Sequence, residues 1–216
     1  MANYNLVYFD LRGRGESIRM VLAFTGVKYT EERVTMEGWP EIKSSGRCPF
    51  GQLPLLELGN GRVISQSVAI LRFLALENGV APDNAYERAR ADMIVDSVKD
   101  MEDKMAMLYW EKDEQRKAQL NTSIYDDNLP KLMGFLTKIL EGNNGGKGYL
   151  VGNKISYADI NVFGFFNGYL GGGKLEVPEQ IKAFPLLVDL YNRVMNEPKI
   201  LEYLKNRKPN PDWYPY

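Results

Sequence analysis

Residues 53–67 have the sequence LPLLELGNGRVISQS, and this stretch decides the fold of the first half of the chain. Its apolar segments 53–58 and 62–64 flank a Gly-Asn-Gly turn, whose glycines tolerate positive φ. Residues 65–79, SQSVAILRFLALENG, then keep helical spacing, with Ser65 as the expected N-cap and the final glycine as the expected stop. The stretch therefore predicts an antiparallel hairpin that leads directly into a helix.

Upstream of the hairpin, the sequence predicts a strand, a helix and a second strand. YNLVYF at 4–9 and KYTEERVT at 28–35 are rich in strand formers, and 16–24 carries apolar residues at helical spacing. Residues 36–52 contain many turn and polar residues and are predicted as a loop. The order βαβ followed by ββα predicts a small mixed sheet covered by helices.

Downstream of Pro82, strand signals largely disappear. A long helix is predicted from Ala85, because apolar residues recur along it in steps of three and four. A second long helix is predicted after Lys117, and Pro130 should kink it or break one of its backbone hydrogen bonds. The Gly- and Asn-rich segment 142–148 is a predicted loop.

Ser156 and Asp159 form a helix-start signal, because Ser-x-x-Asp can cap the first turn from both sides. Two further amphipathic helices are predicted before a Pro-rich tail. The chain is therefore expected to contain an α/β domain at 1–79, a linker at about 80–84 and an all-helical domain at 85–216.

Composition excludes several classes of function. The chain has 216 residues with 27 Lys and Arg against 28 Asp and Glu, and this net charge of -1 gives no general attraction to nucleic acid or anionic membranes. No signal sequence or long apolar segment is present, so neither secretion nor membrane insertion is expected. Cys48 is the single cysteine, which excludes an internal disulfide and favours a reducing compartment.

Histidine is absent from the sequence. Catalysis by a Ser-His-Asp or Cys-His arrangement is therefore impossible, and zinc could be bound only by carboxylates. The 13 tyrosines make a phenol a natural hydrogen-bond donor for a reactive site.

Five short motifs occur in order along the first 67 residues. They are Tyr8-Phe9, Arg12-Gly13-Arg14-Gly15-Glu16, Trp39-Pro40-Glu41-Ile42-Lys43, Phe50-Gly51-Gln52-Leu53-Pro54 and Gln66-Ser67. Together they closely resemble the soluble glutathione transferases, and within them the sigma class, which includes haematopoietic prostaglandin D synthases and the lens S-crystallins of cephalopods. The resemblance extends over essentially the whole chain, and it implies a thioredoxin-like N-terminal domain and an all-helical C-terminal domain.

The resemblance also implies a binding site for glutathione, which carries two carboxylates, one ammonium group and one thiol. Gln66 and Ser67 would bind the γ-glutamyl carboxylate at a helix N-terminus, where free amides and the helix dipole favour an anion. Lys43 and the Trp39 indole would bind the glycyl carboxylate. Leu53 would pair its backbone with the cysteinyl unit.

Three further positions follow from the same resemblance. Pro54 is expected to follow a cis peptide bond, and Gln52 lies beside it in the glutathione-binding motif. Asp100 resembles the acid that reaches the γ-glutamyl amine of the neighbouring subunit. The site would then be complete only in a homodimer.

Tyr8 is the expected catalytic residue, with Arg14 beside it. A thiol of pKa about 8.5 is only about 3% ionised at pH 7, and stabilising the thiolate by about 2.7 kcal/mol makes it about three-quarters ionised. A neutral tyrosine can donate a hydrogen bond to that thiolate, and a nearby arginine adds positive potential. The expected reaction is attack by the bound thiolate on an electrophilic carbon.

The second substrate is expected to bind between the Tyr8–Arg14 loop and the first long helix of the second domain. The candidate lining residues are Phe9, Met101, Met105, Met107, Leu108 and Tyr109. Lys99 occupies the position at which prostaglandin D synthases carry an acid for a divalent metal, and Met107 replaces a tryptophan of their pocket. We therefore expect no metal and no specific prostaglandin pocket.

Three functions remain open from the sequence. The first is conjugation of glutathione to small hydrophobic electrophiles by a cytoplasmic homodimer. The second is a glutathione-dependent isomerase or peroxidase. The third is a non-catalytic structural protein like the S-crystallins, which carry a long insertion where residues 108–120 are short here. The retained Tyr8 and glutathione motifs favour the first.

Overall fold

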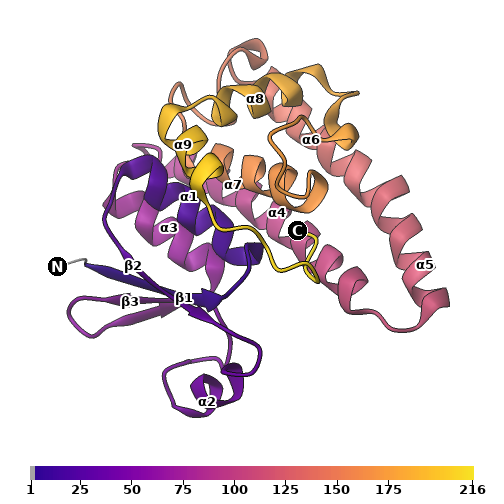
Figure 1. The fold of residues 1–216 in the computed structure, drawn as a ribbon. Coiled ribbons are helices and arrows are strands. Elements are labelled where there is room, and N and C mark those ends of the chain that lie inside the picture. Colours follow the sequence, from indigo (N-terminus) through magenta and orange to yellow (C-terminus); the bar gives the residue numbers. More distant parts are fainter. Residues whose placement is uncertain (1–2) are drawn as a thin grey trace. The chain divides into compact units, whose positions relative to one another are not determined.

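The computed structural model describes residues 3–216, which divide into two compact units. The first unit contains the chain up to Ala81 together with Asn196–Tyr216, and the second contains Pro82–Met195. Figure 1 shows the sheet and the helices of the first unit in indigo and purple, with the C-terminal segment in yellow. The expected combination of an α/β domain and a helical domain is confirmed.

The first unit is built on a four-stranded mixed sheet. Its strands are β1 (Tyr4–Phe9), β2 (Thr30–Val34), β3 (Leu55–Leu58) and β4 (Val63–Ser65), in the spatial order β2-β1-β3-β4. β1 is parallel to β2 and antiparallel to β3, and β3 and β4 form the predicted hairpin. The sheet is therefore the thioredoxin-like arrangement that the resemblance implied.

Three helices accompany the sheet in the first part of the chain: α1 (Glu16–Thr25), α2 (Trp39–Ser44) and α3 (Ser67–Glu77). α1 and α3 contact each other and lie side by side over the sheet, whereas α2 lies away from both (Figure 1). Ile18 and Val21 on α1 and Ile70 and Leu74 on α3 have no exposed surface, and α1 also buries the charged side chains of Glu16 and Arg19. Burial of the apolar side chains fixes the helices against the strands.

Two local predictions in this unit were wrong. Residues 36–52 are not all loop, because α2 forms at Trp39–Ser44 with Pro40 in its first turn, where a missing backbone N–H is tolerated. Ser65 does not cap α3, because it pairs with Leu55 as the last residue of β4. Gln66 is the N-cap instead.

The second unit consists of helices. They are α4 (Ala85–Trp110), α5 (Glu114–Thr122), α6 (Leu129–Glu141), α7 (Tyr157–Phe165) and α8 (Pro185–Met195). Every residue of α7 is buried, and α7 contacts both α4 and α8. The predicted irregularity near Pro130 is present as a wide π-type turn at Ser123–Asn128 between α5 and α6, and Pro130 lies in the first turn of α6.

The predicted cap of α7 is confirmed in both directions. The Asp159 carboxylate accepts hydrogen bonds from the Ser156 amide and hydroxyl, both at 2.8 Å, while the Ser156 side chain accepts from the Asp159 amide. Asp159 also accepts from the Leu150 amide at 2.7 Å, which fixes the preceding loop. Burial raises the pKa of Asp159 to about 6, against the opposing effect of these hydrogen bonds.

The C-terminal segment differs from the predicted domain boundary. Residues 196–216 were expected to belong to the helical domain, but α9 (Pro198–Asn206) contacts α1, and the segment groups with the first unit. A buried ion pair of 2.6 Å joins Arg207 to Glu16, and the Asn210 side chain accepts from the Arg12 amide at 2.8 Å. These long-range contacts hold the tail beside the loop that follows β1.

Candidate functional site

Three of the sequence motifs meet at one end of the sheet. The strand registers pair Val7 on β1 with Leu55 on β3, and Leu55 with Ser65 on β4. Because both pairings are antiparallel, the residues that follow Val7 and Ser65 lie at the same end as those that precede Leu55. These residues are Tyr8, Phe9, Leu53, Pro54, Gln66 and Ser67.

The backbone at this end of the sheet has two unusual conformations. The Leu53–Pro54 peptide bond is cis, as the resemblance implied. Gln66 has φ 73° and ψ 118°, a region that favours glycine and costs other residues about 1–3 kcal/mol. Such strain persists where the surroundings hold it, often at ligand sites. Ser67 begins α3 directly after Gln66, so the open amides of an 11-residue helix face this end.

Tyr8 is held tightly at the end of β1. It is 6% exposed, and its hydroxyl oxygen accepts a hydrogen bond of 3.1 Å from the Arg14 amide. An accepted bond polarises the phenol and strengthens its O–H as a donor. The guanidinium carbon of Arg19 lies 5.8 Å from the centre of the Tyr8 ring and adds positive potential. The arrangement suits stabilisation of an anion next to the hydroxyl.

An apolar cluster surrounds Tyr8. Phe9 contacts the Tyr8 ring edge-on with centroids 5.8 Å apart, and Trp39 contacts Phe9 in the same way at 5.4 Å. Leu53 is buried in the same cluster, so these four predicted residues are brought together. The low polarity around the hydroxyl strengthens any electrostatic contact that it makes.

Lys43 and Gln52 lie on the exposed side of this region. Lys43 is in the last turn of α2, and its Cε lies 3.8 Å from the point where a Cβ on Gly51 would stand. Gln52 follows Gly51 directly and is exposed. The α2 motif and the motif before β3 are therefore neighbours, as a common ligand would require.

Cys48 is not activated. Its sulfur lies 3.9 Å from the carbonyl oxygen of Ile42, to which the thiol donates, and the side chain is buried. Burial raises the pKa of the Cys48 thiol, although Arg47 opposes this shift. A protonated, buried thiol is a poor nucleophile, so Cys48 has a structural role here.

The sequence reasoning did not identify Tyr214, which lies at the same place. Tyr214 packs against the cluster that contains Tyr8, and a Cβ on Gly13 would lie 2.8 Å from the Tyr8 hydroxyl oxygen and 3.2 Å from that of Tyr214. The hydroxyl oxygens of Tyr8 and Tyr214 are therefore no farther apart than 2.8 Å plus 3.2 Å. The aromatic tail DWYPY at 212–216 was the available signal, but nothing local shows where it packs.

The remaining predicted residues belong to α4 in the second unit. Asp100 is exposed, Met101, Met105 and Leu108 are buried, Tyr109 is half-buried, and Met107 is 52% exposed. Lys99 pairs with Asp103 at 2.5 Å. Within residues 3–216 no group of three or more His, Cys, Asp or Glu side chains is placed to hold a metal, and no helix is long and apolar enough to cross a membrane.

Comparisons with known proteins agree with this geometry. The N-terminal domain model of glutathione S-transferases matches residues 4–76, and the C-terminal domain model matches residues 99–207. S-crystallin 4 of Enteroctopus dofleini is 35% identical over 96% of this chain and 98% of its own length. Hematopoietic prostaglandin D synthase of Homo sapiens is 34% identical, with the same two coverages of 96% and 98%.

Solved structures give the same result. A nematode-specific glutathione S-transferase of C. elegans matches with a TM-score of 0.84 at 30% identity, over 98% of this chain and 100% of that one. A Nu-class enzyme from Haemonchus contortus matches with a TM-score of 0.82 at 34% identity, over 97% and 99%. With both domain matches and full-length relatives of this similarity, the chain belongs to the glutathione S-transferase family.

Proposed function

We propose that this protein conjugates reduced glutathione to small hydrophobic electrophiles. The observation that carries the proposal is the placement of Tyr8, whose hydroxyl oxygen accepts a hydrogen bond from the Arg14 amide. Tyr8 lies at the same end of the sheet as four other predicted residues, Leu53, Pro54, Gln66 and Ser67. The family supplies glutathione as the co-substrate.

In this proposal, glutathione lies along the end of the sheet. Gln66 and the N-terminus of α3 bind its γ-glutamyl carboxylate, because open amides and the helix dipole favour an anion there. Lys43 and Trp39 bind the glycyl carboxylate from α2. The backbone of Leu53 pairs with the central cysteinyl unit, which brings the thiol to Tyr8.

The glutathione thiol releases its proton to solvent, and Tyr8 stabilises the resulting thiolate by donating its O–H, while the Tyr8 oxygen accepts from the Arg14 amide. The sulfur attacks the electrophilic carbon, a carbon–sulfur bond forms, and the leaving group departs with its electron pair. The Tyr214 hydroxyl is close enough to Tyr8 to donate to the charge that develops on the electrophile. The rest of the acceleration comes from holding both reactants together.

The family resemblance extends the proposal to the assembly. Asp100 is exposed on α4, which is compatible with a contact to the γ-glutamyl amine in a neighbouring subunit of a homodimer. On α4, Met107 and Tyr109 have exposed surface and are the proposed contacts for the electrophile, whereas Met101, Met105 and Leu108 are buried within the second unit. We expect the protein in the cytoplasm, where glutathione is abundant and Cys48 stays reduced.

The experiment that tests the function compares Tyr8→Phe with Tyr4→Phe. Tyr4 is on the same strand and packs edge-on against Phe73, so its variant is a matched loss of one hydroxyl. We expect Tyr8→Phe to lower kcat with an aryl halide by about 10- to 100-fold, because the thiolate fraction falls. Retention on glutathione-agarose should persist. An unchanged kcat in Tyr8→Phe refutes the assignment.

Similarity to S-crystallin 4 keeps a structural role as the second candidate. The alignment covers 98% of that relative over 216 residues, which leaves no room for a long insertion in it. The short connection between α4 and α5 therefore does not separate enzyme from crystallin. Failure of the wild-type protein to bind glutathione would favour the structural role, and turnover of prostaglandin H2 or a hydroperoxide without aryl halide conjugation would favour an isomerase or peroxidase.

A further inference from the structure

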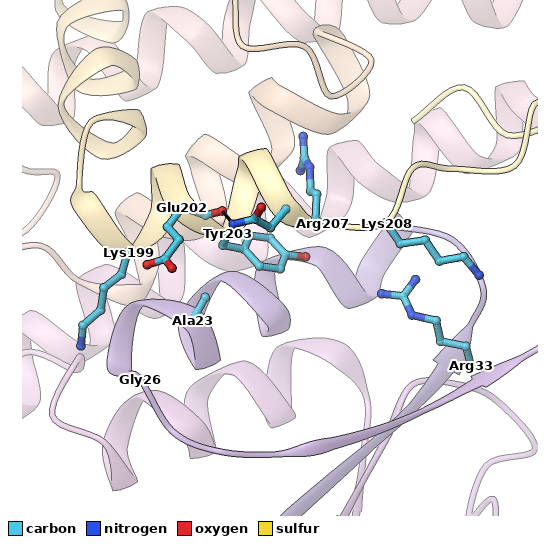
Figure 2. Close-up of a pocket in the computed structure, with 9 residues that line it drawn as sticks. Ala23, Gly26, Arg33, Lys199, Glu202, Tyr203, Arg207 and Lys208 are labelled. Atoms are coloured by element: carbon cyan, nitrogen blue, oxygen red, sulfur yellow. Dashed lines mark hydrogen bonds between the residues drawn. The ribbon is translucent and has the colours of Figure 1, made fainter.

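A groove of about 580 Å³ lies between α1 and α9 in the first unit, and no residue of the five glutathione motifs lines it. Its lining residues include four cations, Arg33, Lys199, Arg207 and Lys208, and one acid, Glu202. Figure 2 shows Lys199 at one end of the groove and Arg33 and Lys208 at the other. This volume lies in the range of small-molecule sites. The overall charge of the chain is close to zero, so the positive charge here is a local feature.

A series of ion pairs joins three residues that line this groove, Arg33, Arg207 and Lys208, to residues outside its lining. Arg207 pairs with Glu16 at 2.6 Å, Glu16 with Arg19 at 3.2 Å, and Arg19 with Glu31 at 2.6 Å. Arg207 and Arg19 are buried, with 5% and 1% of their side chains exposed. This half of the series joins the end of α9 to α1 and β2.

The series continues on the exposed side. Glu31 also pairs with Arg33 at 3.0 Å, Arg33 with Asp10 at 3.3 Å, and Asp10 with Lys208 at 2.5 Å. Six ion pairs therefore link seven residues in series, and the two ends of the series, Arg207 and Lys208, are adjacent in sequence. Four of the seven residues are cations and three are carboxylates. These seven groups therefore carry one positive charge in excess, and two of the cations, Arg33 and Lys208, line the groove; the Lys208 side chain is 53% exposed.

The buried hydroxyl oxygen of Tyr203, which lines this groove, has no hydrogen-bond partner among residues 3–216. A buried donor without an acceptor costs about 1–3 kcal/mol. Figure 2 shows the Tyr203 hydroxyl directed along the groove toward the end at which Arg33 and Lys208 lie.

The protonation state of Tyr203 fits a donor. Burial, assisted by the nearby Glu16 carboxylate, raises the pKa of Tyr203 well above its ordinary value. The positive charge of Arg19 and Arg207 opposes this shift. The hydroxyl consequently stays protonated at neutral pH and can donate to an anion.

We propose that this groove binds a phosphorylated small molecule, with a phosphate group between Arg33, Lys208 and the Tyr203 hydroxyl. Phosphate fits better than a single carboxylate, because its oxygens can accept from a guanidinium, an ammonium and a phenol together. Lys199, whose Nζ lies 3.1 Å from the Cβ position of Gly26, offers a second cation at the other end of the groove. None of these residues belongs to the proposed glutathione site.

The test is isothermal titration of the full-length protein with pyrophosphate and with ADP, using citrate as the carboxylate control. We expect saturable binding of both phosphates that weakens at high salt, and markedly weaker binding of citrate. Lys208→Gln and Tyr203→Phe should each weaken phosphate binding by about tenfold. Lys205→Gln is the matched control, because Lys205 is exposed on α9 but does not line the groove.

Lys208→Gln should have the conjugating activity of the wild type, because Lys208 is outside the proposed glutathione site. The titration measures phosphate binding alone, so its result does not depend on whether the glutathione proposal holds. Absence of saturable phosphate binding at millimolar concentration overturns the proposal. Citrate binding as tight as pyrophosphate binding overturns the assignment to phosphate. An equal loss in Lys205→Gln and Lys208→Gln would place the anion outside the groove.

Discussion

The hydroxyl groups of Tyr8 and Tyr214 approach the same face of Gly13, although 206 positions separate them in the chain. Gly13 has φ 39°, and a Cβ there would lie 2.8 Å from the Tyr8 oxygen. Gly13→Ala should therefore displace both hydroxyls, and we expect kcat to fall by about 100-fold, because misplacement by about 1 Å has that effect. Steady-state kinetics with an aryl halide measures it.

Gly61→Ala is the control for backbone strain alone. Gly61 also has positive φ, at 79°, but a Cβ there meets no atom within 4 Å. Both variants should lose about 1 kcal/mol or more of stability in urea unfolding. If Gly13→Ala keeps wild-type kcat, the close approach at Gly13 has no part in catalysis.

The proposed role of the tail in turnover depends on the Tyr214 hydroxyl. Tyr214→Phe keeps the ring in its apolar cluster and removes only the donor, so we expect kcat to fall severalfold to tenfold, as loss of one hydrogen bond of about 1 kcal/mol implies. The affinity for glutathione should stay the same. Tyr216→Phe is the matched control two residues further along. Equal effects in both variants would indicate general loosening of the tail.

Gln66 should lower the free energy of unfolding through its backbone strain, while its side chain contributes to glutathione binding. Gln66→Gly removes the unfavourable φ of 73° and should raise the free energy of unfolding by about 1 kcal/mol, whereas Gln66→Ala keeps the strain. Both variants lose the proposed contact to the γ-glutamyl carboxylate, and the KM for glutathione should rise in both. A KM that rises in neither variant contradicts the proposed role of Gln66.

Asp159 should make stability depend on pH in an unusual direction. Its folded pKa of about 6 lies above the ordinary value of 3.8, so between these pH values the native state binds more protons than the unfolded state. The free energy of unfolding should fall as pH rises from about 4 to 6, by up to about 3 kcal/mol, and then stay level.

Asp159→Asn removes this titration and leaves one acceptor oxygen for the amides of Ser156 and Leu150, so one of these amides loses its acceptor, at about 1–3 kcal/mol. The stability difference between wild type and variant should shrink between pH 4 and 6, as measured by urea unfolding. Asp113→Asn, at the exposed N-cap of α5, controls for loss of a capping carboxylate. A difference that grows over this range would mean that the accepted hydrogen bonds outweigh burial.

Local signals explain which parts of the fold were predictable. The Gly-Asn-Gly turn, the Ser156 to Asp159 cap and the irregularity near Pro130 each depend on a few adjacent residues, and all three are present. α2 was missed because six residues are too few to show helical periodicity, and its Trp-Pro start looks like a turn. Short helices of this kind depend on packing rather than on sequence pattern.

The site was predictable only in part for a different reason. The five N-terminal motifs identified Tyr8, Leu53 and Gln66, and the strand registers bring these residues to one end of the sheet. The position of Tyr214 depends on contacts across almost the whole chain, such as the Arg12 amide with Asn210. No periodicity or local spacing carries that information.

The buried Arg207–Glu16 pair should hold α9 against α1, because both side chains are only 5% exposed. Arg207→Met leaves Glu16 with Arg19 as its remaining ion-pair partner within residues 3–216, and we expect a loss of about 3 kcal/mol in urea unfolding. Lys182→Met, which breaks an exposed pair with Glu179, should cost less than about 1 kcal/mol.

The double variant Arg207→Met with Glu16→Gln distinguishes the contribution of the ion pair to stability from the contribution of side-chain packing. If the loss in Arg207→Met comes from an uncompensated buried carboxylate, neutralising Glu16 should restore part of it, so the double variant is more stable than the sum of the single losses predicts. Hydrogen exchange should show the α9 amides opening more readily in Arg207→Met than in the double variant. Strictly additive losses would mean that Arg207 acts through its apolar stem, and that the charge of Glu16 does not hold the C-terminal segment in the first unit.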